Sequence, residues 1–112
     1  MTLVLGQKGR GLTRNVQILD ANGDVITPGV WDLVRVRIGR QGEVDVLTVT
    51  SGSPTVAGSS VTKGAVNKVR LDASDLTFAP GTYTFWVEYH DNADAAEWKE
   101  VDREVFVLEP TG

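Results

Sequence analysis

The stretch FAPGTYTFWVEYHD, residues 78–91, decides the fold class. It contains a Pro-Gly pair that is typical of a turn, after which the side chains alternate between two faces. One face is large and apolar, with Tyr83, Phe85, Val87 and Tyr89. The other face is polar apart from one indole, with Thr82, Thr84, Trp86, Glu88 and His90. This two-residue period indicates a β-strand that packs one face against the core.

Similar alternation predicts strands before and after this stretch. Residues 12–20 (LTRNVQILD) place on one face Leu12, Arg14, Val16 and Ile18. The Asn-Gly pair in the following DANGD, residues 20–24, predicts a hairpin turn. In residues 31–40 (WDLVRVRIGR), the arginines face away from Val34, Val36 and Ile38. The long last strand, residues 97–110, has Val101, Val105 and Val107 on one side and Phe106 and Leu108 on the other.

The segments between these strands are less regular. Residues 43–50 (EVDVLTVT) are so uniformly β-branched that both faces of this strand could be covered. Residues 51–64 are rich in Ser, Gly and Thr, which predicts a long loop or an irregular edge hairpin anchored by Val56 and Val61. Ser74 can cap a single helical turn. Together, about seven strands at this spacing predict an all-β fold, a two-sheet sandwich.

The composition fits one compact domain. A chain of 112 residues can bury a single core, and the absence of cysteine excludes disulfides and Cys-based zinc or redox sites. The opening MTLVLG is too short for a signal peptide, and no apolar run approaches membrane-spanning length. We therefore expect a soluble, unprocessed protein that assembles in a reducing cytosol and has no membrane partner.

The net charge of −4 is unevenly distributed along the chain. Residues 1–56 carry six cations and five acids, whereas residues 57–112 carry five cations and ten acids. The acidic protein has no sustained basic face that could displace the counterions of a nucleic acid, so we expect neither DNA nor RNA as its main partner. Opposed patches of charge instead favour docking between neighbouring molecules.

The order of these motifs resembles a known family, the immunoglobulin-like N-terminal domain of tailed-phage baseplate upper proteins and related phage virion proteins. Three stretches carry the resemblance: GQKGRGLTRNVQILDANGDVITPG (6–29), LVRVRIGRQG (33–42) and LDASDLTFAPGTYTFWVEY (71–89). It implies an immunoglobulin-like antiparallel β-sandwich and a structural role that anchors a component to the phage particle. Family members often continue into a coiled coil or a receptor-binding region, whereas this sequence stops at Gly112. A capsid decoration or a tail-attached accessory protein is therefore expected as much as a baseplate adaptor.

The glycine-rich stretch GQKGRG, residues 6–11, raises the question of a phosphate site. A phosphate loop of the Walker type ends in Gly-Lys-Ser/Thr and opens a helix, but here Leu12 and Thr13 lead into a predicted strand. We therefore expect residues 1–11 to form a flexible N-terminal arm and residues 12–112 to form a single sandwich domain. The arm and its junction carry Lys8, Arg10 and Arg14, which could order against an acidic surface on a neighbouring subunit.

No pattern in the sequence supports a metal, a cofactor or catalysis. DANGD alternates oxygen donors as a calcium loop does, but Val25 stands where an EF-hand has a glycine after its third ligand, and Trp31 stands where it has a glutamate. A hard divalent ion could in principle use His90, Asp91, Asp94 and Glu97, although a solvated acidic turn is the simpler interpretation. A single histidine cannot supply a typical catalytic zinc site, and the chain has no G-x-S-x-G elbow. We expect a protein without enzymatic activity or cofactor.

Aromatic and acidic residues supply the remaining candidates for an interface. Trp86 lies opposite the apolar face of its strand, so it would be an aromatic hot spot if that face were exposed. Residues 88–109 hold eight acids and two cations, and this acidic hairpin could meet a basic surface through Glu100 and Glu104. The candidate interface residues are therefore Lys8, Arg10, Arg14, Trp86, Glu100 and Glu104.

The sequence thus predicts a structural protein of a tailed-phage virion. It would dock in multiple copies, or as a homo-oligomer, on repeated sites of capsid or tail subunits. It would assemble in the host cytoplasm and reside in the virion. The alternative is a carbohydrate-binding module, in which Trp31, Trp86 and Trp98 would form a stacking platform for a glycan.

Overall fold

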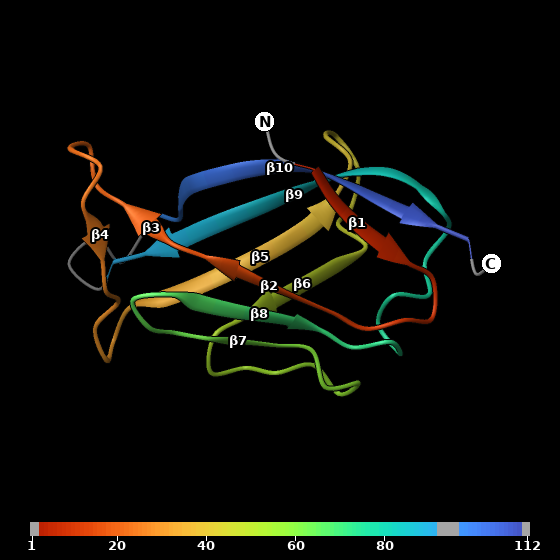
Figure 1. Cartoon of the computed structure of the whole chain (residues 1–112), viewed down its shortest axis with the longest axis horizontal. Coiled ribbons are helices and arrows are strands. Elements are labelled where there is room, and N and C mark those ends of the chain that lie inside the picture. The colour runs from red at the N-terminus through yellow and green to blue at the C-terminus, as the bar shows by residue number, and fades with distance from the viewer. Residues whose placement is uncertain (1–2, 92–96, 111–112) are drawn as a thin grey trace.

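All regular secondary structure in the described part of the chain is β-strand. The computed structural model describes residues 3–91 and 97–110, and these segments contain ten strands and no helix (Figure 1). Consequently, neither segment contains a helix that could cross a membrane. The strands are β1 (Leu3–Gln7), β2 (Leu12–Val16), β3 (Ile18–Leu19), β4 (Val25–Ile26), β5 (Leu33–Gly39), β6 (Leu47–Thr50), β7 (Ser60–Thr62), β8 (Asn67–Leu71), β9 (Gly81–His90) and β10 (Lys99–Glu109).

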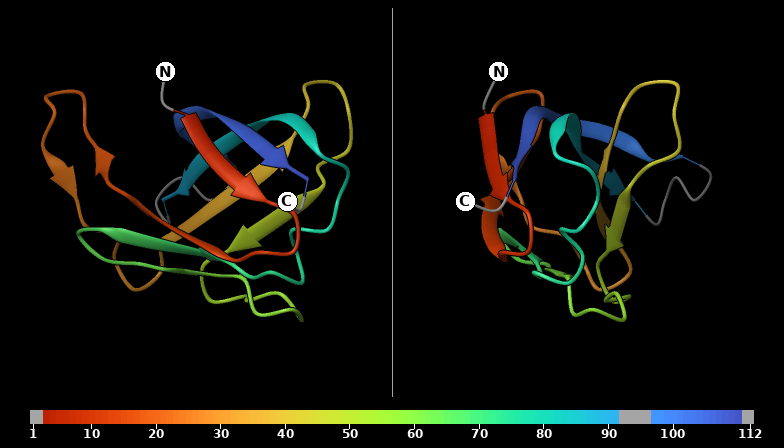
Figure 2. Two further views of the ribbon diagram at one scale, coloured as in Figure 1. Left: turned by 45° about the vertical axis from the view of Figure 1, so that its right-hand side comes forward. Right: turned by 90° about the vertical axis from the view of Figure 1, so that its right-hand side faces the viewer.

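The strands form two larger sheets and one small hairpin. The five-stranded sheet has the order β1-β10-β9-β5-β6, the three-stranded sheet has the order β2-β8-β7, and β3 pairs with β4. Every pair is antiparallel except β1 with β10. Figure 2 shows the three-stranded sheet lying against one face of the five-stranded sheet, with the β3–β4 hairpin projecting at one end.

The two larger sheets share one hydrophobic core, an arrangement consistent with a β-sandwich. The predicted inward face of β9 is confirmed, because Tyr83, Phe85, Val87 and Tyr89 are all buried. The predicted inward face of β5 is confirmed as well, and β2 and β8 contribute buried Val16, Val69 and Leu71 from the opposite sheet. The β3–β4 hairpin also forms where the Asn-Gly pair predicted it, with Gly23 at a φ of 86°.

The prediction of a flexible arm over residues 1–11 is wrong for the described residues of that segment. Residues 3–7 form β1, which runs parallel to β10 from the Leu3–Val105 pair to the Gln7–Glu109 pair. The chain then stays attached, because the Lys8 N–H donates to the carbonyl of Glu109 at 2.8 Å. Gly6 permits this packing, since a Cβ there would lie 2.8 Å from the Phe106 ring. The glycine-rich composition of residues 6–11 thus gave no indication of β1, a strand whose Val4 and Gly6 face inward.

Three smaller predictions also need correction. Val61 is buried as expected, but Val56 is fully exposed and anchors nothing. Residues 73–75 form a turn and not a helix, and the carboxylate of Asp72, which accepts the Ser74 N–H at 3.1 Å, caps this turn. The strand within residues 43–50, β6, has only one covered face, because Val49 is buried whereas its neighbour Thr48 is exposed.

An ion pair joins the two larger sheets from inside. Glu104 lies opposite Phe85 in the β9–β10 register, so its side chain points toward the core, and it is only 3% exposed. Arg14 of β2 donates to it from the facing sheet. Two atoms of the pair, Arg14 Nε and Glu104 Oε2, are buried without a hydrogen-bond partner among the described residues. The pair therefore specifies how the sheets stack, at a considerable cost in desolvation.

We predict that Arg14→Ala lowers the free energy of unfolding by about 3 kcal/mol, because it leaves the Glu104 carboxylate buried without its partner. The apolar pair Arg14→Met with Glu104→Leu should bring stability to within about 1 kcal/mol of the natural chain, or above it. Urea unfolding monitored by tryptophan fluorescence measures both changes. A loss below about 1 kcal/mol in Arg14→Ala would contradict the proposed burial of charge.

Candidate functional site

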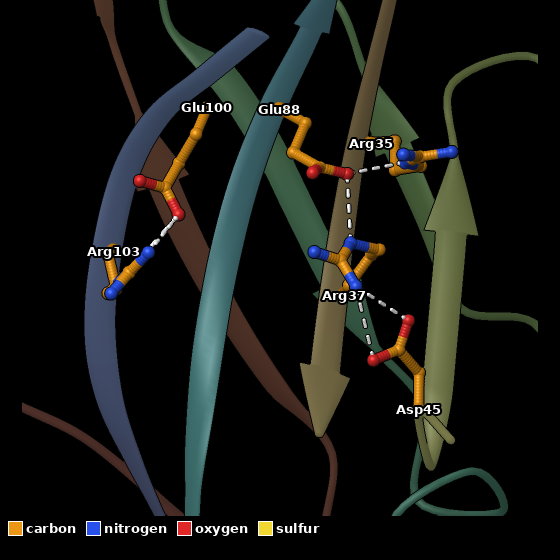
Figure 3. Close-up of polar contacts among 6 residues, drawn as sticks. All are labelled: Arg35, Arg37, Asp45, Glu88, Glu100 and Arg103. Carbon is orange, nitrogen blue, oxygen red and sulfur yellow. Dashed lines mark hydrogen bonds and ion pairs between the residues drawn. The ribbon is translucent and has the colours of Figure 1, made fainter. Parts of the chain in front are cut away.

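The outward face of the five-stranded sheet carries an ordered set of charged and aromatic side chains, here called the sheet face. The register aligns two rows across β10, β9 and β5: Glu100, Glu88 and Arg35 in one, and Arg103, Trp86 and Arg37 in the next. Figure 3 shows the polar members of both rows joined by dashed contacts, together with Asp45 from the segment before β6. The acids and arginines of the sheet face thus form ion pairs, some between strands and one within β10.

Glu88 is the centre of these contacts. One of its oxygens, Oε1, accepts from Arg35 Nε at 2.6 Å and from Arg37 Nε at 2.9 Å. The Glu88 side chain is only 10% exposed, so the two charge-assisted hydrogen bonds compensate for lost hydration. A buried carboxylate with two guanidinium partners holds both arginines in fixed positions on the sheet.

Arg37 also contacts a second acid. Its Nη1 donates to Asp45 Oδ2 at 2.9 Å, and Gly39 makes room for that side chain, since a Cβ there would lie 2.7 Å from Asp45 Oδ1. Burial by itself lowers the pKa of Arg37, but the hydrogen bonds to Asp45 and Glu88 outweigh it, and the pKa is raised. The side chain therefore remains charged and paired.

A β-bulge places Glu100 on this face. The register between β10 and β9 shifts between Glu100 and Asp102, which leaves Val101 without a partner. Residues three apart on a regular strand point to opposite faces, but the bulge lets Arg103 donate to Glu100 Oε1 at 2.9 Å from Nη2. Val101 consequently packs against the core, so the prediction that it shares a side with Val105 and Val107 is wrong.

The three tryptophans do not form one platform. Trp86 is 8% exposed, because the guanidinium of Arg37 lies 4.5 Å from the centre of its ring. Trp98 is half-buried beneath Arg35, at 4.0 Å. Trp31 is 76% exposed but belongs to the turn before β5. Two of the three rings are therefore stacked with arginine, as cation–π pairs, and the expectation of an uncovered hot spot at Trp86 is not met.

The sheet face becomes apolar toward its β1 edge. Leu3 and Leu5 of β1 are 53% and 57% exposed and lie beside Val105 and Val107 of β10. Because β1 ends the strand order, no strand of the described residues pairs with its outer side. The face thus combines an apolar stripe with arginines that are already fixed in place.

The other sequence-predicted residues have structural roles. Arg14 and Glu104 bind each other inside the molecule, so they are not available to a partner, whereas Glu100 is on the sheet face. Lys8 and Arg10 lie in the turn between β1 and β2. No helix follows this turn, so it lacks the geometry of a phosphate loop. Beside it is an open hollow of about 230 Å³, lined in part by Arg10 and Glu109.

The metal and calcium candidates receive no support from the geometry. The described residues hold no cluster of three or more His, Asp or Glu side chains that could bind a metal ion. Asp20 uses its carboxylate inside the hairpin, where Oδ1 accepts the N–H groups of Asn22 at 2.8 Å and Asp24 at 3.0 Å. Asp94, which the sequence suggested as a ligand with His90, lies outside the described residues.

A second electrostatic feature lies at the end of β9. The Tyr89 hydroxyl donates to Asp32 Oδ2 at 2.7 Å. The pKa of Tyr89 is raised above its usual value. Burial of the phenol is the largest cause, and the hydrogen bond and the charge of Asp32 add to it. This contact fastens the turn before β5 to the sheet.

A scan of protein-family models finds none that matches this sequence, and a search of curated proteins finds no similar chain. Any functional conclusion therefore depends on the residues themselves and on the resemblance noted above.

We predict that Glu88→Leu lowers the free energy of unfolding by about 2 kcal/mol, because Arg35 and Arg37 lose their shared acceptor. Glu100→Gln is the matched control. Its side chain is 42% exposed, so loss of its pair with Arg103 should change stability by less than about 0.5 kcal/mol. Chemical denaturation measures the free energy of unfolding of both variants. An equal decrease in both would show that Glu88 contributes no more to stability than Glu100 does.

The Tyr89–Asp32 contact predicts a dependence of stability on alkaline pH. Tyr89→Phe should cost about 1 kcal/mol at pH 8 through the lost hydrogen bond. A phenol whose pKa is raised in the folded state contributes fully below its unfolded pKa of about 10 and loses that contribution as pH rises further. The difference in stability between the natural chain and Tyr89→Phe, measured by urea unfolding from pH 8 to 11, should therefore shrink above pH 10. A difference that stayed constant would contradict the raised pKa.

Proposed function

We propose that the chain is an immunoglobulin-like β-sandwich. The strand order supports this assignment: β1, β10, β9, β5 and β6 correspond to strands A′, G, F, C and C′, and β2, β8 and β7 to strands B, E and D. The side chain of Tyr83 adds support. Near the start of β9 its hydroxyl donates to the carbonyl of Ala79 at 2.5 Å, as in the tyrosine corner of such domains.

We further propose that the protein is a non-enzymatic structural component of a tailed-phage virion. It docks on repeated sites of the capsid or tail, as a decoration or accessory protein, and repetition of the contact supplies avidity. The observation that supports docking is the composition of the sheet face. Exposed Leu3 and Leu5 share this face with the guanidinium groups of Arg35 and Arg37, which are already ordered, and arginine is enriched at interfaces.

The order of the sheet face favours docking because little side-chain freedom remains to be lost. Arg35 and Arg37 are held by Glu88 and by the rings of Trp98 and Trp86 before any partner arrives. A partner that covers the apolar stripe therefore does not have to immobilise these long side chains, which would otherwise weaken binding. The opposite signs of Arg103 and Glu100 at the rim fit a partner of mixed charge.

The carbohydrate-binding alternative has less support. A stacking platform needs exposed, coplanar rings, and arginines lie over one face each of Trp86 and Trp98. Trp31 remains as a single exposed ring.

The test is sedimentation of the purified protein with phage particles assembled without it, separated into capsids and tails. We expect saturable binding to one of the two, and Leu5→Glu should weaken it at least tenfold, or by about 1.4 kcal/mol, because a charge would enter the apolar stripe. Val56→Glu is the matched control, since this fully exposed valine lies in the loop between β6 and β7. Binding to neither fraction, together with saturable binding on a glycan array, would replace the proposal with the carbohydrate-binding alternative.

A further inference from the structure

The turn at residues 29–32 displays two apolar side chains to solvent. The Asp32 N–H donates to the carbonyl of Gly29 at 3.3 Å, so Val30 and Trp31 are the central residues of a β-turn. Val30 is 83% exposed and Trp31 is 76% exposed. Turns favour Gly, Pro, Asn, Asp and Ser for their backbone geometry, so formation of the turn does not explain a Val-Trp pair at its centre.

This turn is fastened from two sides, and we call it the pinned turn. The Lys63 ammonium, from the β7–β8 connection, donates to the carbonyls of Gly29 at 2.9 Å, Val30 at 3.0 Å and Asp32 at 2.8 Å. These three bonds use every proton of the ammonium group. On the other side, Asp32 Oδ2 accepts both the Gly29 N–H and the Tyr89 hydroxyl at 2.7 Å. A rigid backbone thus presents an indole that the described residues leave open.

The pinned turn lies at the end of the molecule where the β3–β4 hairpin and the β7–β8 turn also gather, at the left of Figure 1. Those neighbouring segments carry further exposed apolar side chains, with Leu19 at 51%, Val25 at 44% and Val66 at 47%. The local charge is negative. Two carboxylates lie at this turn, that of Asp32 and that of Asp91, whose charge acts on Tyr89, and one cation, the Lys63 that faces the turn carbonyls.

From this arrangement we infer a second docking site, separate from the sheet face, in which Trp31 is the anchor. The occupant is a protein partner with an apolar recess that accepts an indole and with lysines or arginines at its rim. The recess follows from the exposed Val30–Trp31 pair, and the cationic rim follows from Asp32 and Asp91, which outnumber Lys63. Pinning supports affinity, because the backbone that carries the anchor is held in place before binding and less conformational freedom is lost.

The charge decides against a lipid surface as the occupant. Aromatic turns can insert into a membrane interface, but cytoplasmic membrane surfaces are anionic and attract basic segments. The carboxylates of Asp32 and Asp91 would be repelled there, whereas they complement a basic protein surface.

Site-specific photo-cross-linking tests the inference in cells that produce the protein naturally. The full chain would carry p-benzoylphenylalanine in place of Val30, with Trp31 retained, and the control would carry it in place of Val44, which is 91% exposed in the β5–β6 loop. We expect one predominant protein adduct from position 30 and none from position 44. Adding Trp31→Ala should reduce this adduct at least tenfold, and the cross-linked segment of the partner should be apolar and flanked by lysine or arginine.

A second measurement distinguishes the effect of the pinned backbone on affinity from the effect of Trp31 exposure alone. Once the partner is purified, Lys63→Met, which keeps Trp31, should weaken its affinity several-fold by loosening the turn. Circular dichroism of each variant verifies that the sheets are intact. Unchanged affinity in Lys63→Met would overturn the role of pinning.

Several outcomes would overturn the site itself. They are the absence of a position-specific adduct, an adduct that survives Trp31→Ala, and Trp31-dependent sedimentation with phosphatidylcholine–phosphatidylserine vesicles. Because Trp31 lies outside the sheet face, Leu5→Glu should leave the adduct unchanged, so failure of this inference is distinguishable from failure of the proposed virion role.

Discussion

The rest of the structure depends on the burial of β9 on both faces. This strand lies between β10 and β5, and its inward side chains form the middle of the core. Its outward residues Trp86 and Glu88 are also at most 8% exposed, which is unusual for an indole and a carboxylate on the outer surface of a sheet. A carboxylate in that position needs cationic donors on a neighbouring strand, and β5 supplies them by alternating arginine with valine and isoleucine.

The two buried carboxylates specify geometry more than they add stability. Glu88 fixes the register of β5 against β9, because a slip of one residue would both part it from its arginines and expose the aliphatic face of β5. Glu104 fixes a different relation, since Arg14 reaches it from the facing sheet. Removing a charge from water is costly, and replacement by apolar pairs is often neutral. Both pairs therefore fit a role in selecting one register and one stacking of the sheets.

The sequence predicted the all-β class and the inward faces of β5 and β9, because alternation in these strands reflects which face meets the core. It failed where tertiary contacts override local pattern. Residues 3–7 look like an arm because of their glycine-rich continuation, yet Gly6 is what lets β1 approach Phe106. The bulge at Val101 has no local signature, although it decides that Glu100 faces Arg103. Likewise, no one-dimensional pattern reveals that Arg14 and Glu104, ninety residues apart, bind each other.

The candidate sites were harder to predict than the fold for the same reason. Trp86 lies on the outward face as alternation required, but its exposure depends on where the Arg37 side chain goes, and that depends in turn on Glu88. No sequence pattern singles out Trp31, because nothing in the sequence indicates that Lys63 will bind the carbonyls around it. Exposure of an aromatic ring is thus a property of its neighbours in space.

Both proposed surfaces derive their rigidity from the same strand. Trp86 and Glu88 of β9 hold the arginines of the sheet face, and Tyr89, the next residue, holds Asp32 of the pinned turn. Consecutive residues point to opposite faces of a strand, so β9 supports one surface from its outward side and the other from its inward side. A local distortion of β9 near Glu88 would therefore disturb both surfaces, whereas changes at Leu5 or Val30 would remain confined to one. This arrangement makes the central strand the physical link between the two sites.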